Sequence, residues 1–154
     1  MKKILLFSVL SLFIVMVGCN SNGKNDIYGE YTFEEVSYLS PISSMLKDTL
    51  KENMKDGKYI IQKDLYKVQS SELNIEIVSP KYVKEEIDMD SLIIFETDFF
   101  RMNNIKSRYY IYDKDGNKTN SVLFVSPNDL WISTRTNLTP DGQLIVFNMI
   151  KLSH

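Results

Sequence analysis

Short stretches rich in β-branched and aromatic residues recur from residue 58 to the end of the chain, separated by turn-forming residues. Strands spaced in this way, at about 8 to 12 residues, are typical of β-sandwiches and β-barrels. Two of the separating segments, residues 113–117 and 139–142, contain Asp-Gly, which favours antiparallel hairpins. The expected strands are residues 59–62, 65–69, 73–79, 82–86, 92–97, 108–112, 121–126, 130–135 and 143–152. The spacing therefore predicts a mainly β, antiparallel fold.

Residues 27–38 predict an additional first strand, because polar and apolar residues alternate there and aromatic residues are frequent. Tyr31 and Phe33 share one face of this strand, whereas Val36 falls on the opposite parity. We expect a β-bulge at the two glutamates between Phe33 and Val36, since one extra residue restores the phase of the alternation.

One amphipathic helix is expected over about residues 41–56. Ser40 suits the N-cap, Pro41 suits the first helical position, and Gly57 is a stop signal. Apolar residues recur at helical spacing along it: Ile42, Met45, Leu46, Leu50 and Met54. The last strand, residues 143–152, is apolar on both parities and must be covered on both faces, so we expect this helix to cover its outer face.

An aromatic first strand, a single helix and a long run of strands together resemble the lipocalin-like barrels of bacterial lipoproteins. The residues that carry this resemblance are Tyr28-Gly29-Glu30-Tyr31, Asp129-Leu130-Trp131-Ile132 and Leu144-Ile145-Val146-Phe147. The resemblance implies an antiparallel meander that closes into a barrel, with the helix after the first strand. The alternative is an α+β, cystatin-like sheet wrapped on one helix.

The N-terminus predicts export. Two lysines follow Met1, and the uncharged stretch from Ile4 to Gly18 has 15 residues. A membrane-spanning helix needs roughly 20 apolar residues, and a short basic start before an apolar run is the layout of a secretory signal. Residues 1–18 are therefore predicted to be a cleaved signal peptide.

The end of this segment, Met16-Val17-Gly18-Cys19, resembles the lipobox of bacterial lipoproteins. The resemblance implies that Cys19 is acylated and becomes the first residue of the mature protein. Cys19 is also the only cysteine, and an exported protein that used cysteines structurally would carry them in pairs. Asn20 stands where a retention signal for the inner membrane would place Asp, so an outer-membrane anchor is favoured if the cell has two membranes.

Residues 19–26 are polar and read as a lipidated, flexible tether, and residues 27–154 read as one β-rich domain. Without Lys2 and Lys3, the 18 basic residues fall to 16 against 20 acidic residues, a side-chain balance of −4. This balance excludes a typical nucleic-acid binder, which carries a basic excess.

The sequence offers few groups for catalysis or for metal and cofactor binding. The only histidine, His154, is the last residue, and acylation would remove the only thiol. There is no Gly-x-Ser-x-Gly motif, no Cys/His cluster and no glycine-rich phosphate loop. We therefore expect no catalytic residues, no metal and no cofactor. A hydrolase built on neighbouring carboxylates, such as Glu34 and Glu35, stays a distant alternative.

Aromatic residues on the expected strands are the remaining candidates for a binding site. Tyrosine combines apolar area with a hydroxyl, which suits the lining of a barrel. The candidate ligand-lining residues are Tyr31, Phe33, Tyr59, Tyr110 and Tyr112. The leading hypothesis is a non-enzymatic, lipid-anchored β-barrel that binds a small apolar or amphipathic ligand. The alternative is a protein-interaction module of the envelope: an immunity protein, an inhibitor or an accessory subunit.

Overall fold

The computed structural model describes residues 27–154 except Glu72 and Ile93. The predicted signal peptide (residues 1–18) and lipidated tether (residues 19–26, with Cys19) lie outside the described residues. No helix within the described part of the chain is both long and apolar enough to cross a bilayer.

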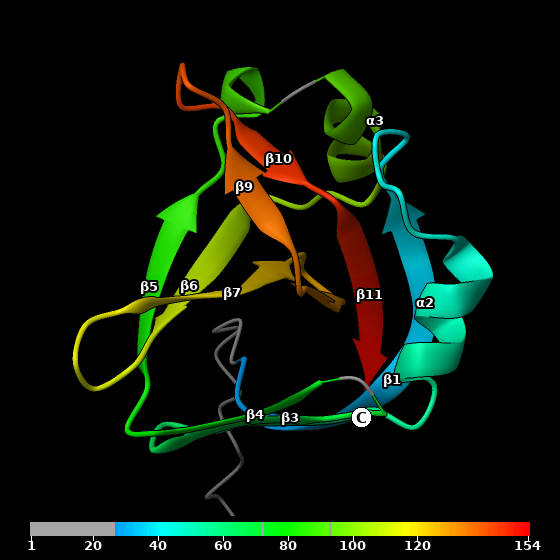
Figure 1. The fold of residues 1–154 in the computed structure, drawn as a ribbon. Helices are drawn as coiled ribbons and strands as arrows, with labels where there is room; N and C mark the ends of the chain where they lie inside the picture. Colours follow the sequence, from blue (N-terminus) through cyan, green and yellow to red (C-terminus); the bar gives the residue numbers. More distant parts are fainter. Residues whose placement is uncertain (1–26, 72, 93) are drawn as a thin grey trace, which may run out of the picture.

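Nine strands form one antiparallel sheet in the order β4-β3-β2-β1-β11-β8-β7-β6-β5. The sheet curls into a half-barrel: β5 to β7 form one side, β1 and β11 the other, and β3 and β4 the base in Figure 1. Its strands are β1 (Gly29–Leu39), β2 (Lys58–Ile61), β3 (Leu65–Gln69), β4 (Asn74–Val78), β5 (Lys81–Glu86), β6 (Ser107–Tyr112), β7 (Lys118–Val125), β8 (Leu130–Ser133) and β11 (Asn148–Ser153). The predicted mainly β, antiparallel fold is confirmed, and the half-barrel is consistent with a lipocalin-like barrel.

The order of strands follows the chain, except that the last strand pairs with the first. β11 lies between β1 and β8, and the sheet ends at β4 and β5. These two end strands are joined by only Ser79 and Pro80, yet no ladder pairs them among the described residues. Ser79 has a φ of 55°, a left-handed conformation that turns the chain sharply there.

The predicted strand over residues 143–152 is two strands on different sheets. β9 (Thr136–Leu138) and β10 (Leu144–Val146) form a separate hairpin, and the chain joins the main sheet only at Asn148. The side-chain oxygen of Asn148 accepts a hydrogen bond from the Thr134 backbone N–H at 3.1 Å, and the Phe147 N–H donates to the Arg135 carbonyl at 3.1 Å. These bonds fix the crossover.

The predicted strand over residues 92–97 is wrong. This region forms a 3₁₀ turn, η1 (Met89–Ser91), and a helix, α3 (Ile94–Met102). The Asp88 side chain accepts from the Asp90 N–H at 3.0 Å at the start of η1. Glu96 and Phe100 are i, i+4 neighbours and both fully buried, so the buried face has helical rather than strand spacing. A short apolar run alone does not separate the two periodicities.

The predicted helix over residues 41–56 is shorter than expected. α2 spans Lys47–Met54, and Leu46 rather than Ser40 is its N-cap. The Ser43 hydroxyl accepts from the Met45 N–H at 3.2 Å, a local bond that competes with a helical turn. Leu46 is 73% exposed, so packing does not hold an earlier helical turn.

Two apolar clusters lie on the two faces of the sheet. The interior cluster fills the curve of the half-barrel and includes Leu50 and Met54 of α2. The outer cluster includes Phe100 of α3, Val146 of β10 and Met149 of β11. The expectation that the first helix covers the outer face of the last strand is therefore wrong, because α3 and β10 cover that face instead.

The predicted bulge in β1 is confirmed. The pairing of β1 with β11 shifts register between Phe33 and Glu35 and again between Val36 and Tyr38. The second shift places Val36 in the interior cluster and Tyr38 against the outer cluster, although they are two residues apart.

Candidate functional site

The interior of the half-barrel contains three of the five predicted ligand-lining residues. Tyr31 and Tyr59 pair across β1 and β2, are 6% and 0% exposed, and belong to the interior cluster. Phe33 is partly buried against the same cluster. Residues in register on neighbouring strands share a face, so the pairing explains why these side chains meet.

The other two predicted residues lie on the opposite face. Tyr110 and Tyr112 of β6 belong to or pack on the outer cluster, whereas Tyr109 and Ile111 point inward. Lys118 Nζ lies 3.2 Å from the Tyr110 ring centroid, a cation–π contact on the outer face. Because β6 carries aromatic residues on both faces, its sequence alone does not show which of them point into the interior.

Besides Tyr109, two interior tyrosines, Tyr66 and Tyr82, were not among the predicted ligand-lining residues. Tyr66 is fully buried, and its hydroxyl makes no well-formed hydrogen bond. Burial raises the pKa of Tyr66, although the nearby Ser121 side chain opposes this. Tyr82 donates from its hydroxyl to the Gln62 carbonyl at 3.0 Å, and burial raises its pKa too. The alternation in β3, where Tyr66 and Val68 share a buried face, is the signal that could have identified Tyr66.

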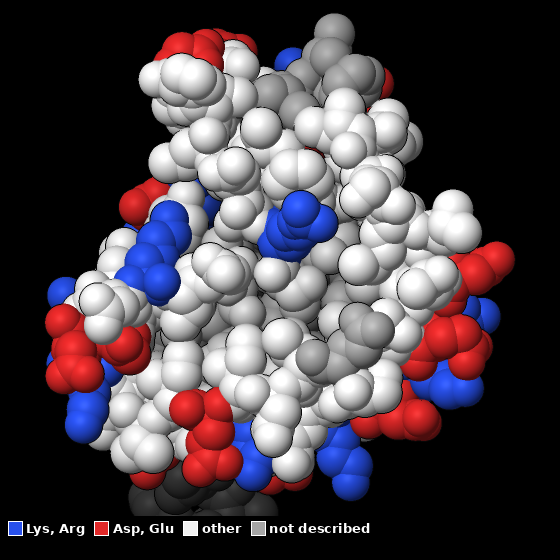
Figure 2. Space-filling model, viewed as in Figure 1, with Lys and Arg blue, Asp and Glu red and all other residues white. Residues whose placement is uncertain are grey.

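Eight partly buried apolar side chains pack against the interior cluster, and we term this set the mouth of the half-barrel. They are Phe33, Leu39, Met45, Leu73, Ile75, Ile77, Tyr82 and Tyr109. On the face drawn in Figure 2, charged side chains lie mainly along the margins, and the middle is mostly uncharged apart from basic groups in its upper part. The mouth offers apolar side chains next to the hydroxyl groups of Tyr82 and Tyr109.

Three described hollows lie away from this interior. One of about 330 Å³ lies on the outer face of β1 to β3, where Ile60 is among the lining residues together with charged residues that include Glu30 and Lys67. One of about 340 Å³ lies at Asp56 and Ser70, and one of about 220 Å³ lies beside Lys118. The second and third hollows have mainly polar linings and match an apolar ligand poorly, whereas the lining of the first is more apolar than polar.

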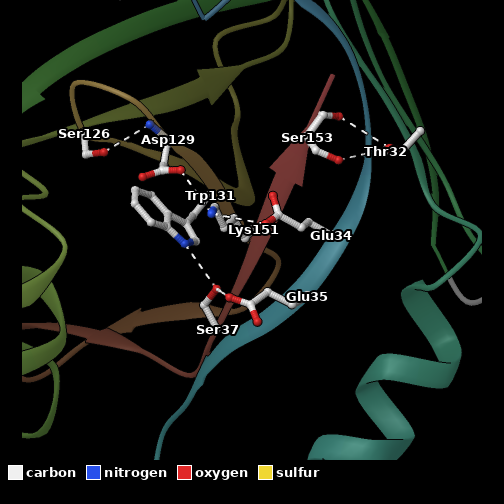
Figure 3. A network of polar contacts seen from close by, with 9 residues as sticks. All are labelled: Thr32, Glu34, Glu35, Ser37, Ser126, Asp129, Trp131, Lys151 and Ser153. Atoms are coloured by element: carbon white, nitrogen blue, oxygen red, sulfur yellow. Dashed lines mark hydrogen bonds and ion pairs between the residues drawn. The ribbon is translucent and has the colours of Figure 1, made fainter.

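A polar network connects β1, β11 and the start of β8 on the outer face (Figure 3). Lys151 Nζ lies 3.2 Å from Glu34 Oε1 and 3.1 Å from Asp129 Oδ1, and both carboxylates raise the pKa of Lys151. The Trp131 Nε1–H donates to Ser37 Oγ at 3.3 Å. The network holds together β1 and β11, the first and last strands along the chain. It also occupies Glu34, one of the neighbouring carboxylates considered for hydrolysis.

Glu96 is a buried carboxyl group that the sequence analysis missed. It is 0% exposed on α3, its Oε1 accepts from the Val146 N–H at 3.0 Å, and its Oε2 has no hydrogen-bond partner. Burial raises the pKa of Glu96 to about 7, and burial together with the nearby Glu96 charge raises the pKa of Tyr38. The available signal was the helical spacing of Glu96 and Phe100 within an apolar, Phe-rich segment. The group ties α3 to β10.

The terminal histidine packs against the interior. The centroid of the His154 ring lies 4.3 Å from the centroid of the Tyr31 ring, although His154 as a whole is exposed. The Asp113 carboxylate accepts from the Asp115 and Asn117 N–H groups, as a hairpin turn requires. Across residues 27–154, excluding the two undescribed positions, no group of three or more His, Cys, Asp or Glu side chains could hold a metal ion.

The comparisons with known proteins give no relative to which the chain can be assigned. No protein-family model, no curated protein and no solved structure matches it.

Proposed function

We propose that this chain is a lipid-anchored, non-enzymatic protein of the cell envelope that binds a small apolar or amphipathic ligand. The observation that carries the proposal is the mouth of the half-barrel, where partly exposed apolar side chains lie beside buried tyrosine hydroxyls. Apolar contact with a few polar groups is typical of sites for small ligands.

The anchor in this proposal is Cys19, with an outer-membrane location favoured if the cell has two membranes. It is supported by Met16-Val17-Gly18-Cys19 after a short apolar run and by the absence of any second cysteine in the sequence. Stable anchoring takes more than one acyl chain, and a lipoprotein modification supplies them. Intact mass spectrometry of protein from the envelope tests the anchor, since an unmodified Cys19 would refute it.

Native mass spectrometry of a soluble form beginning at residue 24 tests ligand binding after incubation with a lipid extract. We expect retained ligand on this protein and its loss in Ile75→Arg, which places a cation in the mouth. Val78→Arg is the matched control: it lies on the same strand with its side chain on the opposite face and is 64% exposed. Equal retention by both variants, or none by the parent, would refute the proposed site.

A protein-interaction module is the second candidate function. Ile42 and Leu46 are 52% and 73% exposed just before α2, and exposed apolar groups in proximity can mark a protein interface. Crosslinking from Ile42→Cys in intact envelopes, compared with Lys51→Cys on the exposed side of α2, tests it. A reproducible partner captured only from position 42 would favour this function over ligand binding.

A further inference from the structure

We propose that one corner of the half-barrel rests on the lipid headgroups of the membrane that holds the anchor. The corner consists of Tyr28, residues 62–65 and residues 78–82, and we term it the Tyr28 corner. The inference rests on the lipid anchor proposed above and adds an orientation to it. Its partner is an anionic lipid surface.

The Tyr28 corner is one connected unit in which separate segments meet. The Tyr28 and Tyr82 rings make an edge-to-face contact with centroids 5.8 Å apart. The Tyr82 hydroxyl donates to the Gln62 carbonyl at 3.0 Å, and the Ser79 N–H donates to the Asp64 carbonyl at 2.8 Å. The hairpin between β2 and β3 and the connection between β4 and β5 are thus held beside the start of the described chain.

The exposed side chains of this corner suit a membrane interface. Tyr28 is 43% exposed and Val78 is 64% exposed, and both are among the large apolar side chains that the surface displays. Tyrosine is enriched at membrane interfaces because its ring is apolar and its hydroxyl stays in water.

The charges of the corner suit an anionic surface. Lys63 and Lys81 are exposed there with one opposing carboxylate, Asp64, which gives a local balance of +1. The mature chain as a whole has a side-chain balance of −4. An anionic surface therefore attracts this corner and repels much of the remaining protein, within a Debye length of about 8 to 10 Å.

The tether limits how far this corner can be from the lipid. Eight residues, 19–26, separate Ile27 from the membrane if Cys19 carries the acyl chains. A fully extended chain of that length spans about 28 Å, and a flexible one averages about 16 Å. Ile27 is itself buried in the interior cluster, so the tether begins from a fixed point next to Tyr28. The opposite end of the molecule, at the turn between β9 and β10, lies far from the start of the chain in Figure 1.

Site-specific quenching on the acylated full-length protein tests the orientation. Acylation of Cys19 leaves an introduced cysteine as the only free thiol, so Gln62→Cys and the matched exposed control Asp141→Cys can each take one fluorophore. In vesicles of phosphatidylcholine and phosphatidylglycerol with a headgroup nitroxide lipid, we expect at least about three-fold stronger quenching at position 62.

The charge contribution has its own test. We expect quenching at position 62 to fall toward that at position 141 in the double variant Lys63→Glu with Lys81→Glu. The matched control is Lys51→Glu with Lys55→Glu, at the end of α2, which should leave quenching at position 62 unchanged. Equal quenching at positions 62 and 141 with Cys19 acylated by intact mass would overturn the orientation while leaving the anchor standing. An unmodified Cys19 would overturn the anchor and the orientation together.

Discussion

Replacement of Glu96 by Gln tests the buried carboxyl on α3. The pKa of Glu96 is raised from 4.5 to about 7 by burial. Between these values the unfolded chain loses the proton while the folded protein keeps it, so the free energy of unfolding falls as pH rises. The contribution of protonated Glu96 to the free energy of unfolding is fully present below pH 4.5 and is lost by about pH 7. A shift of this size corresponds to about 3 kcal/mol, at 1.36 kcal/mol per pKa unit.

Glutamine keeps an oxygen that can accept the Val146 N–H but carries no charge at any pH. We therefore expect Glu96→Gln to match the parent near pH 4.5 and to exceed it in free energy of unfolding by up to about 3 kcal/mol at pH 8. The Tyr38 hydroxyl, which faces Glu96 from β1, is neutral throughout this range because its pKa is raised above 10.0.

Urea unfolding at a series of pH values, followed by the fluorescence of Trp131, measures the difference between the two proteins. Asp98→Asn, an exposed carboxyl on the same helix, is the control and is expected to leave the pH profile close to that of the parent. If Glu96→Gln and the parent change in parallel between pH 4.5 and 8, Glu96 is not the buried titrating group described here.

Three further substitutions follow from packing and the outer network. Lys151→Met removes the ammonium group that bridges two carboxylates and should lower stability by about 1 kcal/mol, with the loss smaller in high salt; urea midpoints at low and high salt check this. Gly57→Ala places a methyl group 2.7 Å from the Met54 carbonyl oxygen and should cost about 1 to 3 kcal/mol, visible as a lower Tm, and an unchanged Tm would contradict the tight approach. Trp131→Ala should lower the free energy of unfolding by about 3 to 5 kcal/mol because Trp131 is 1% exposed. Calorimetry measures this loss, and Trp131→Phe should show a smaller one.

The sequence carries the strand pattern clearly because alternation and turn chemistry agree. β3 matches its predicted range, and the turn at Asp113 forms as expected. The bulge in β1 was predictable because Val36 breaks the parity of Tyr31 and Phe33. These features depend on contacts between near neighbours in the chain, which local sequence encodes.

Features that depend on distant contacts were not predictable. The segment that forms α3 was predicted to be a strand. Its buried face includes both Glu96 and Phe100, and that face can be recognised only from its contacts with β10. Tyr110 was assigned to the interior although it faces outward, because both parities of β6 carry tyrosine. Helix α2 begins late because no partner covers Leu46.

The pairing of β1 with β11 sets the order in which this protein can become folded. Thr32 and Ser153 are hydrogen-bonded neighbours separated by 121 residues, so bringing these strands together costs roughly 4 kcal/mol of loop-closure entropy. If the chain is exported with its N-terminus first, β1 can pair with β2 early, but the edge of β1 that receives β11 stays unpaired until the final residues have crossed. Loss of residues 148–154 would remove β11 and leave β4-β3-β2-β1 and β8-β7-β6-β5 as two separate sheets. The single pairing of β11 with both β1 and β8 therefore makes the whole nine-stranded sheet depend on the last strand to be made.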